Sequence, residues 1–205
     1  MDLVIVRHAE PVRVEAHETN GNPADPRLTE RGRTQADRLA DWLRHEHFDA
    51  ILVSPKRRAI ETAAPIAHAL AMPAIVVDGL IEYDSLATEY IPIEEMQANG
   101  DPRFAAMIEG RWEEFGGEAP AAFRARISMT LDTIIAQHAG QRVIAVCHGG
   151  VVNLALAIVA GLERHLWFRP EYTSISRIVA SRNGARSVQS INETAHLFGR
   201  RDAAS

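Results

Sequence analysis

Apolar residues along this chain fall into short continuous runs that alternate with longer, regularly spaced segments. The first short run, at residues 3–6, is rich in β-branched residues, as expected for a strand buried on both faces, and further strands are predicted at residues 49–54, 75–77 and 143–146. The longer segments repeat apolar residues every three or four positions, which predicts helices at residues 30 to about 47, 59–70 and 120 to about 137. Thr29 is placed to cap the first helix. This alternation favours a three-layer α/β/α sandwich around a mostly parallel sheet.

Two segments depart from the alternation. Residues 11–26 are polar and contain Pro and Gly, so we expect a long loop beside the end of the first strand. Residues 79–117 are acidic and aromatic, and we expect them to form a cap of short helices and loops over the sheet edge. This cap is interpreted as an insertion within a single domain that spans residues 1–205.

The last part of the chain contains a helix and a hairpin. From Val151 the chain is apolar on all sides, which indicates a helix packed against several neighbours. Asn183 and Gly184 both tolerate positive φ and separate two strand-like segments, at residues 174–181 and 187–191, which predicts a β-hairpin. We expect residues 199–205 to form a frayed tail.

Composition limits what the protein does. With 205 residues and 46% hydrophobic content, the chain can bury a substantial core. Its single cysteine, Cys147, excludes an intramolecular disulfide and any multi-cysteine zinc site. A net charge of −5 gives no electrostatic reason to expect nucleic acid as a partner. Because no segment has the pattern of a secretory signal or a membrane span, we expect a cytoplasmic monomer or homodimer that does not bind membranes.

Two of the predicted strands end in histidine. His8 follows Arg7 at the end of the first strand, and His148 ends the fourth. Ligands bind beyond the carboxyl ends of the strands of an open α/β sheet, so we expect both imidazoles in one crevice. Arg57 and Arg58 follow the second strand, and their forked guanidinium groups suit phosphate. Because a neutral imidazole can attack phosphorus and arginines can hold its oxygens without a metal ion, these residues predict an anion site with a built-in nucleophile.

Blocks of sequence in a fixed order carry a family resemblance. They are LVIVRHAE at residues 3–10, LTERGRTQA at 28–36, SPKRRAIETA at 54–63, Gly117-Glu118, His148-Gly149-Gly150 and NETAHL at 192–197. Together these blocks resemble the motifs of the histidine phosphatase superfamily, in the branch of phosphoglycerate-mutase-like phosphatases. One block alone is a weak signal, but the ordered set covers most of the chain and is highly specific.

The resemblance implies a role for each matched residue. His8 is the residue that accepts the phosphoryl group, and Arg7 and Arg58 hold the phosphoryl oxygens. His148 donates a hydrogen bond to the group in transfer, and the Gly149 amide adds another. The resemblance implies neither a metal ion nor any other cofactor.

The resemblance also implies a proton donor, a glutamate after the third strand, and Glu82 matches it best. Such an acid protonates the leaving oxygen and, once ionised, activates the water that hydrolyses phosphohistidine. The family's usual Gly-x-Trp-Glu-Gly is absent after this residue, so Asp84 remains a rival for the role. Ala9 stands where the family usually has glycine, and Val14 falls near the position of a family asparagine, which removes or reroutes one phosphate contact.

Other residues suggest other chemistry, and for each we favour a structural interpretation. Cys147 lacks the downstream arginine of a cysteine phosphatase, because Asn153 stands at that position, so it is interpreted as a buried strand residue. His45 and His47 point to different sides of a helix, which disfavours a metal site. Arg57 is expected to face solvent or an acidic partner. The cap contains a row of large apolar residues that either line a substrate pocket or pack only against the rest of the cap. We favour packing for these residues, which are Phe104, Met107, Trp112 and Phe115.

The sequence therefore predicts a metal-independent phosphatase that hydrolyses a small phosphorylated metabolite, a phosphomonoester, through phospho-His8. A first rival is a phosphoglycerate mutase, which returns the phosphoryl group to another hydroxyl. Mutases of this family tend to have longer chains and an asparagine in the first motif. A second rival is a non-catalytic anion-binding regulatory protein on the same fold, which the presence of all four core residues and an acid disfavours.

Overall fold

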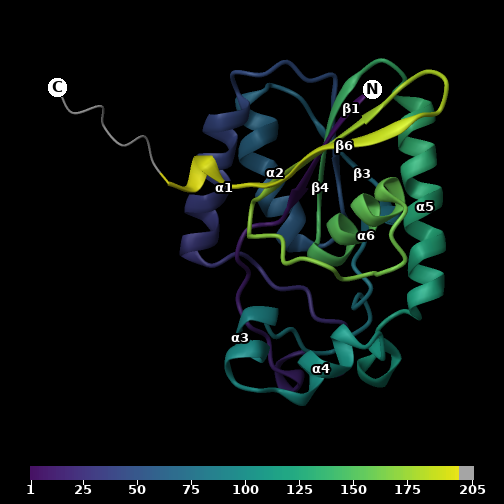
Figure 1. Cartoon of the computed structure of the whole chain (residues 1–205). Coiled ribbons are helices and arrows are strands. Elements are labelled where there is room, and N and C mark those ends of the chain that lie inside the picture. The colour runs from purple at the N-terminus through teal and green to yellow at the C-terminus, as the bar shows by residue number, and fades with distance from the viewer. Residues whose placement is uncertain (199–205) are drawn as a thin grey trace.

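The computed structural model describes residues 1–198 and has a six-stranded sheet at its centre (Figure 1). The strands are β1 (Asp2–Arg7), β2 (Ala50–Val53), β3 (Ala74–Val76), β4 (Arg142–Cys147), β5 (Ile175–Ala180) and β6 (Arg186–Glu193). Their order in the sheet is β3-β2-β4-β1-β5-β6. The first four strands are parallel, and β5 is antiparallel to both β1 and β6. The predicted strands and hairpin are confirmed. The frayed tail predicted at residues 199–205 lies outside the residues that the structure describes.

Helices cover both faces of the sheet. α1 (Glu30–Leu43) and α2 (Arg57–Ala69) pack on the face that carries Val4 and Val6 of β1. α5 (Pro120–Gln137) and α6 (Gly149–Ala160) pack on the opposite face, with Leu3 and Ile5. Successive side chains of a strand point to opposite faces, so β1, buried on both, contributes to both halves of the core. The predicted three-layer α/β/α architecture is confirmed.

The boundaries of α1 show where periodicity alone was insufficient. Thr29 caps the helix as predicted, because its side chain accepts a hydrogen bond from the Gly32 amide at 2.9 Å. The predicted end at about residue 47 is too late, since the helix ends at Leu43. Residues 44–47 are all polar and offer no apolar side chain to bury, so extending the helix through them would gain no packing.

Residues 79–117 form short elements beyond one end of the sheet. The helices are α3 (Ile93–Ala98) and α4 (Pro102–Ile108), and a 3₁₀ turn follows at Trp112–Phe115. Figure 1 shows α3 and α4 apart from the long helices, at the end where β1 and β4 finish. The loop at residues 11–26 lies against this segment, because Val14 pairs with Tyr90 through backbone hydrogen bonds. Among residues 1–198, no helix is both long and apolar enough to cross a bilayer.

Candidate active site

The two histidines predicted to share a crevice do so. β1 and β4 pair in parallel, with Arg7 opposite Cys147, so the next residue of each strand leaves the sheet at the same edge. The rings of His8 and His148 lie edge to face with their centroids 5.1 Å apart. Both residues are buried. Strand register therefore places both imidazoles in one site.

The His8 imidazole is neutral and held in a single tautomer. Its Nδ1 lies 2.8 Å from the Ala9 carbonyl, which can only accept a hydrogen bond, so Nδ1 carries the proton. The Nε–H of Arg58 donates to Nε2 at 3.3 Å, which places the lone pair of His8 beside this guanidinium. Burial, aided by the charges of Arg58 and Arg7, lowers the pKa of His8 well below its ordinary value. The arrangement leaves Nε2 without a proton, as a nucleophilic nitrogen requires.

Ala9 fits the position at which related sequences usually have glycine. It is fully buried and is not among the residues with positive φ, so its methyl group meets no backbone strain. Its amide donates to Oγ1 of Thr62 at 2.9 Å, and that hydroxyl donates to the Arg58 carbonyl at 2.7 Å. The backbone after His8 is thus fastened to the helix that carries Arg58.

Arg7 is held from three sides. Its Nη1 donates to the Pro170 carbonyl at 2.6 Å and to Oε1 of Glu94 at 3.0 Å. Its guanidinium lies 3.9 Å from the centre of the Tyr172 ring, and the Tyr172 hydroxyl donates to the same Glu94 carboxylate at 3.0 Å. Nε of Arg7 is buried and has no partner within residues 1–198, so this N–H is available to donate to an anion.

His148 has a similar unpaired atom. Its Nε2 lies 2.7 Å from the Ser54 hydroxyl, and its Nδ1 is buried without a partner in the described part of the chain. Burial, with the positive charge of Arg58, lowers the pKa of His148 well below its ordinary value. His148 is also the N-cap of α6, and Gly149 opens that helix, whose N-terminal dipole favours an anion.

Glu82 is a buried carboxyl group whose pKa is raised towards neutral pH. Burial and the neighbouring charge of Asp84 raise the pKa of Glu82 to about 7. The Gly150 amide donates to its Oε2 at 2.8 Å, which anchors the carboxyl at the start of α6. Asp84 instead lies 3.6 Å from Nη2 of Arg58, which is an ion-pair distance. Glu82 and Asp84 therefore lie in different surroundings, the first buried beside α6 and the second paired with Arg58.

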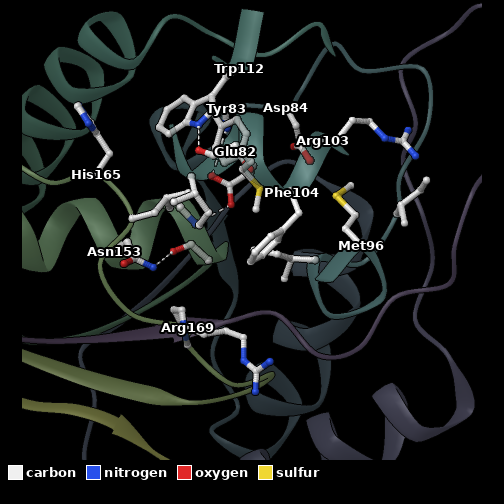
Figure 2. A pocket seen from close by; sticks show the side chains of 18 of the residues that line it. Glu82, Tyr83, Asp84, Met96, Arg103, Phe104, Trp112, Asn153, His165 and Arg169 are labelled. Carbon is white, nitrogen blue, oxygen red and sulfur yellow. Dashed lines mark hydrogen bonds between the residues drawn. The ribbon is translucent and has the colours of Figure 1, made fainter. Parts of the chain in front are cut away.

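Most of these groups line a cavity of about 700 Å³, although the fully buried His148 is not among its lining residues. Arg7, His8, Arg58, Glu82 and Gly149 line one end of it, and the wall continues over α3, α4 and the loop at residues 162–170. Figure 2 shows the Phe104 ring and the Glu82 carboxyl group within this space. The whole row predicted to pack the cap also lines the cavity, so packing alone was an incomplete interpretation: Phe104, Met107, Trp112 and Phe115.

Sequence reasoning gave no role to several residues that hold the site together. Ser54 and Thr62 lie inside a recognised block, at residues 54–63, so their motif could have pointed to them. Glu94 and Tyr172 hold Arg7 from segments without any motif. Tyr90 likewise places its ring 4.8 Å from the Arg58 guanidinium, beside the backbone pairing with Val14. No local signal could have indicated these long-range contacts.

The residues set aside on sequence grounds lie outside the chemistry. Cys147 is buried, and burial raises the pKa of its thiol, which disfavours a reactive thiolate. Arg57 is exposed and pairs with Glu61 at 2.6 Å, as expected for a solvent-facing residue. Nε2 of His47 lies 3.3 Å from Asp49, and His45 accepts a hydrogen bond from Arg44, so these rings have separate partners.

Comparisons with known proteins place the chain in a family. The sequence pattern of the histidine phosphatase superfamily (branch 1) matches residues 3–194. Phosphoserine phosphatase 1 of Hydrogenobacter thermophilus is 30% identical over 205 residues, which cover 95% of this chain and 93% of that protein. Probable phosphoglycerate mutase GpmB of Yersinia enterocolitica is 28% identical over 207 residues, which cover 96% and 95%. The solved structure of Bacillus stearothermophilus YhfR has a TM-score of 0.74 at 25% identity and covers 96% of this chain and 98% of that one.

Proposed function

The chain belongs to the histidine phosphatase superfamily, and from this premise we propose that it is a phosphatase that hydrolyses a phosphomonoester through phosphohistidine at His8. The observation that carries the proposal is the state of the His8 ring. Nδ1 of His8 donates a hydrogen bond to the Ala9 carbonyl. The lone pair of His8 Nε2 faces Nε of Arg58, and these two nitrogens are 3.3 Å apart. The likeness to a relative named phosphoserine phosphatase supports hydrolysis as the overall reaction.

In the first step, Nε2 of His8 attacks phosphorus and the bond from phosphorus to the alcohol oxygen breaks. Arg7, Arg58 and Nδ1 of His148 hold the nonbridging oxygens, with the Gly149 amide as a further donor. Glu82 gives its proton to the departing alkoxide, and a pKa of about 7 keeps that proton available near neutral pH.

The second step returns the enzyme to its starting state. The Glu82 carboxylate takes a proton from water as the water oxygen attacks phosphorus, and the bond between phosphorus and Nε2 breaks. Inorganic phosphate leaves, and His8 and Glu82 regain their original protonation. Every catalytic group in the cycle is a residue of the chain, so we expect hydrolysis to persist in the presence of a chelator.

Replacement of the proposed nucleophile tests the whole scheme. His8→Ala is expected to abolish hydrolysis of an aryl phosphate, and the wild-type protein is expected to form an acid-labile, alkali-stable phosphoenzyme. Circular dichroism of the variant checks that its fold is retained. Full activity in a folded His8→Ala variant would exclude the mechanism, and phosphate binding without turnover in the wild type would favour a non-catalytic anion-binding protein.

Phosphoglycerate mutase activity is the second candidate, because a relative named as a probable phosphoglycerate mutase matches nearly the whole chain. A mutase would pass the phosphoryl group from His8 to another hydroxyl rather than to water. Incubation with phosphoglycerates distinguishes the two activities, since a mutase yields the isomer and a phosphatase yields free phosphate.

The role of Glu82 predicts a dependence on the leaving group. Glu82→Gln is expected to lower kcat about a hundredfold or more for an alkyl phosphate, whose alkoxide needs a proton, and much less for a nitrophenyl phosphate. Asp84→Asn serves as the matched comparison, since it also removes a carboxylate near Arg58. Equal losses on both esters in Glu82→Gln, with a selective loss in Asp84→Asn, would transfer the role to Asp84.

A further inference from the structure

The cavity extends well beyond the space that a phosphoryl group needs. Its volume of about 700 Å³ lies within the range of ~300–1,000 Å³ typical of pockets that enclose drug-sized ligands. At about 30 Å³ per water molecule, such a volume holds roughly twenty waters, and a three-carbon phosphomonoester would displace less than half of them. A small metabolite would therefore leave most of the cavity filled with water.

The wall beyond the phosphate end is predominantly apolar and aromatic. It draws side chains from α3, α4, the 3₁₀ turn after α4 and the loop at residues 162–170: Met96, Phe104, Met107, Phe115, Trp167 and Phe168. Figure 2 shows the Phe104 ring projecting into the cavity. Trp112, which also lines the cavity, is stacked on Tyr83 with ring centroids 4.3 Å apart. Water held against such a surface is readily displaced by an apolar ligand group.

The cations on this wall are poorly placed to bind a second anionic group. Arg103 is already engaged by two carboxylates: its Nε donates to Asp101 at 2.9 Å, and its Nη1 pairs with Glu89. Arg169 and Arg164 are exposed at the rim, where Arg169 lies 3.4 Å from Glu171. A substrate carboxylate would have to compete with these acidic partners or bind in the presence of solvent.

The part of the wall formed by the loop at residues 162–170 is preformed. Asn153 of α6 holds the loop at residues 162–170, because its Oδ1 accepts from the Trp167 amide at 3.0 Å and from the Phe168 amide at 3.2 Å. Its Nδ2 donates to the Phe168 carbonyl at 3.0 Å. A binding surface already fixed by hydrogen bonds loses little conformational freedom when a ligand arrives.

We propose that the alcohol half of the substrate is a bulky aromatic or aliphatic group without a carboxylate, bound against Phe104, Met96 and the loop that Asn153 holds. This inference rests on the proposed phosphatase function, and it disfavours phosphoserine, which is small and carries two further charges. The phosphoryl group occupies the His8 end, and the apolar group fills the space that extends over α3 and α4.

Three alkyl phosphates with similar leaving groups test the inference: 2-(1-naphthyl)ethyl phosphate, ethyl phosphate and phosphoserine. Calorimetry on the His8→Ala variant gives dissociation constants without turnover. Burial of the naphthyl group is expected to favour the first ester over ethyl phosphate by about thirtyfold, even after the loss of ligand freedom. A ratio within threefold, or tighter binding of phosphoserine, would overturn the inference.

Substitutions in the same background locate the binding surface. Phe104→Ala is expected to lower the ratio of the two affinities by about tenfold, because the naphthyl group loses a packing partner. Phe198→Ala is the matched control, since Phe198 is 75% exposed and lies outside the cavity lining, and it should keep the original ratio. If Phe104→Ala fails to fold, Met96→Ala provides the same measurement at a second lining residue. An unchanged affinity ratio in whichever of these two variants folds would contradict the assigned binding surface.

Turnover by the wild-type protein separates the two proposals. Preferential hydrolysis of the naphthylethyl ester supports both the phosphatase function and the apolar alcohol group. If none of the esters is hydrolysed but the calorimetric preference remains, the phosphatase proposal fails and the ligand class stands. If all are hydrolysed at similar kcat/KM and bound without preference, the phosphatase stands and the ligand class fails.

Discussion

His8 and Glu82 acquire opposite pKa shifts from one physical cause. Burial disfavours the charged form of each, so the pKa of His8 falls well below its ordinary value and that of Glu82 rises to about 7. Near neutral pH the site therefore contains a neutral His8 imidazole and a Glu82 carboxyl group that is partly protonated. These are the forms that the first half of the proposed reaction consumes.

The raised pKa of Glu82 also predicts how stability depends on pH. Because the folded-state pKa of about 7 exceeds the ordinary value of 4.5, folding binds a proton more tightly. The contribution of Glu82 to the free energy of unfolding is thus fully present below pH 4.5 and is lost as pH rises through 7. That loss is at most about 3 kcal/mol.

The stability of Glu82→Gln relative to the wild type should therefore be greater at pH 8 than at pH 5, because only the wild type loses the contribution of the protonated carboxyl group. Urea unfolding at both pH values measures the difference, and Glu30→Gln, an exposed position on α1, controls for the loss of one charge. The same stability difference at both pH values would contradict the assignment of a buried, proton-binding carboxyl group.

At this scale, the sequence predicted the residues that belong to motifs and missed those that support them. His8, Arg58 and His148 follow strand ends or open a helix, which places them by local pattern. Glu94 and Tyr172 hold Arg7 through contacts that depend on where α3 and β5 lie in the folded chain. Such contacts have no local signature, so the sequence alone could not indicate them.

Among the elements, α6 shows how two adjacent glycines serve different needs. A Cβ at Gly150 would clash with Oε1 of Glu82 and lie 3.0 Å from Cδ1 of Tyr83. A Cβ at Gly149 would meet nothing nearer than Nε of Arg7, at 3.7 Å, which is an ordinary contact. The second glycine is therefore required for the close approach of the acid to the helix.

This difference predicts unequal effects of the same substitution. Gly150→Ala is expected to displace Glu82 and lower kcat for an alkyl phosphate about a hundredfold. Gly149→Ala retains the backbone amide and is expected to lower it by less than about tenfold. Steady-state kinetics on the two variants, with circular dichroism to check folding, makes the comparison. Similar losses in both would show that Glu82 does not depend on close contact at Gly150.

Elements were predictable where burial imposes a period. β1, β2, β4 and α5 agree with the predicted segments because their apolar residues face the core on one or both sides, whereas the edge strand β3 exposes Ile75 and Val76. The end of α1 was wrong because helix propensity continues into polar residues that have nothing to pack against. Burial, not propensity, determines where that helix stops.

At the scale of the whole molecule, the chemistry and the cavity wall rest on structures of different rigidity. β1 and β4 are buried along nearly their whole length, whereas α3 has six residues and none that is fully buried. Elements with few buried contacts open locally at lower free energy than a central strand. The cavity wall can therefore open while the nucleophile stays in place.

Native-state hydrogen exchange should reveal this difference. Backbone amides of α3 and α4 are expected to exchange through local opening, faster than those of β1 and β4, which should require global unfolding. Exchange followed by mass spectrometry on peptides from both regions provides the measurement. Equal protection of residues 93–108 and of β4 would mean that wall and sheet open as one unit.

The order of the strands in the sheet could not be predicted from the sequence. Alternating strands and helices indicate a mostly parallel sheet, but several orders satisfy that pattern. The observed order places β4 between β1 and β2 although β4 follows both by a long stretch of chain. This non-local pairing is what brings His148 beside His8.

The position of β1 also has a consequence for how the protein is made. Asp2 pairs with Arg142 on one side and with Val179 on the other, so the strand leaves the ribosome long before either neighbour exists. During synthesis its apolar residues stay without their final partners, which exposes the nascent chain to aggregation. Enzymatic activity should accordingly appear late and abruptly, only after β5 has been translated and has joined the sheet.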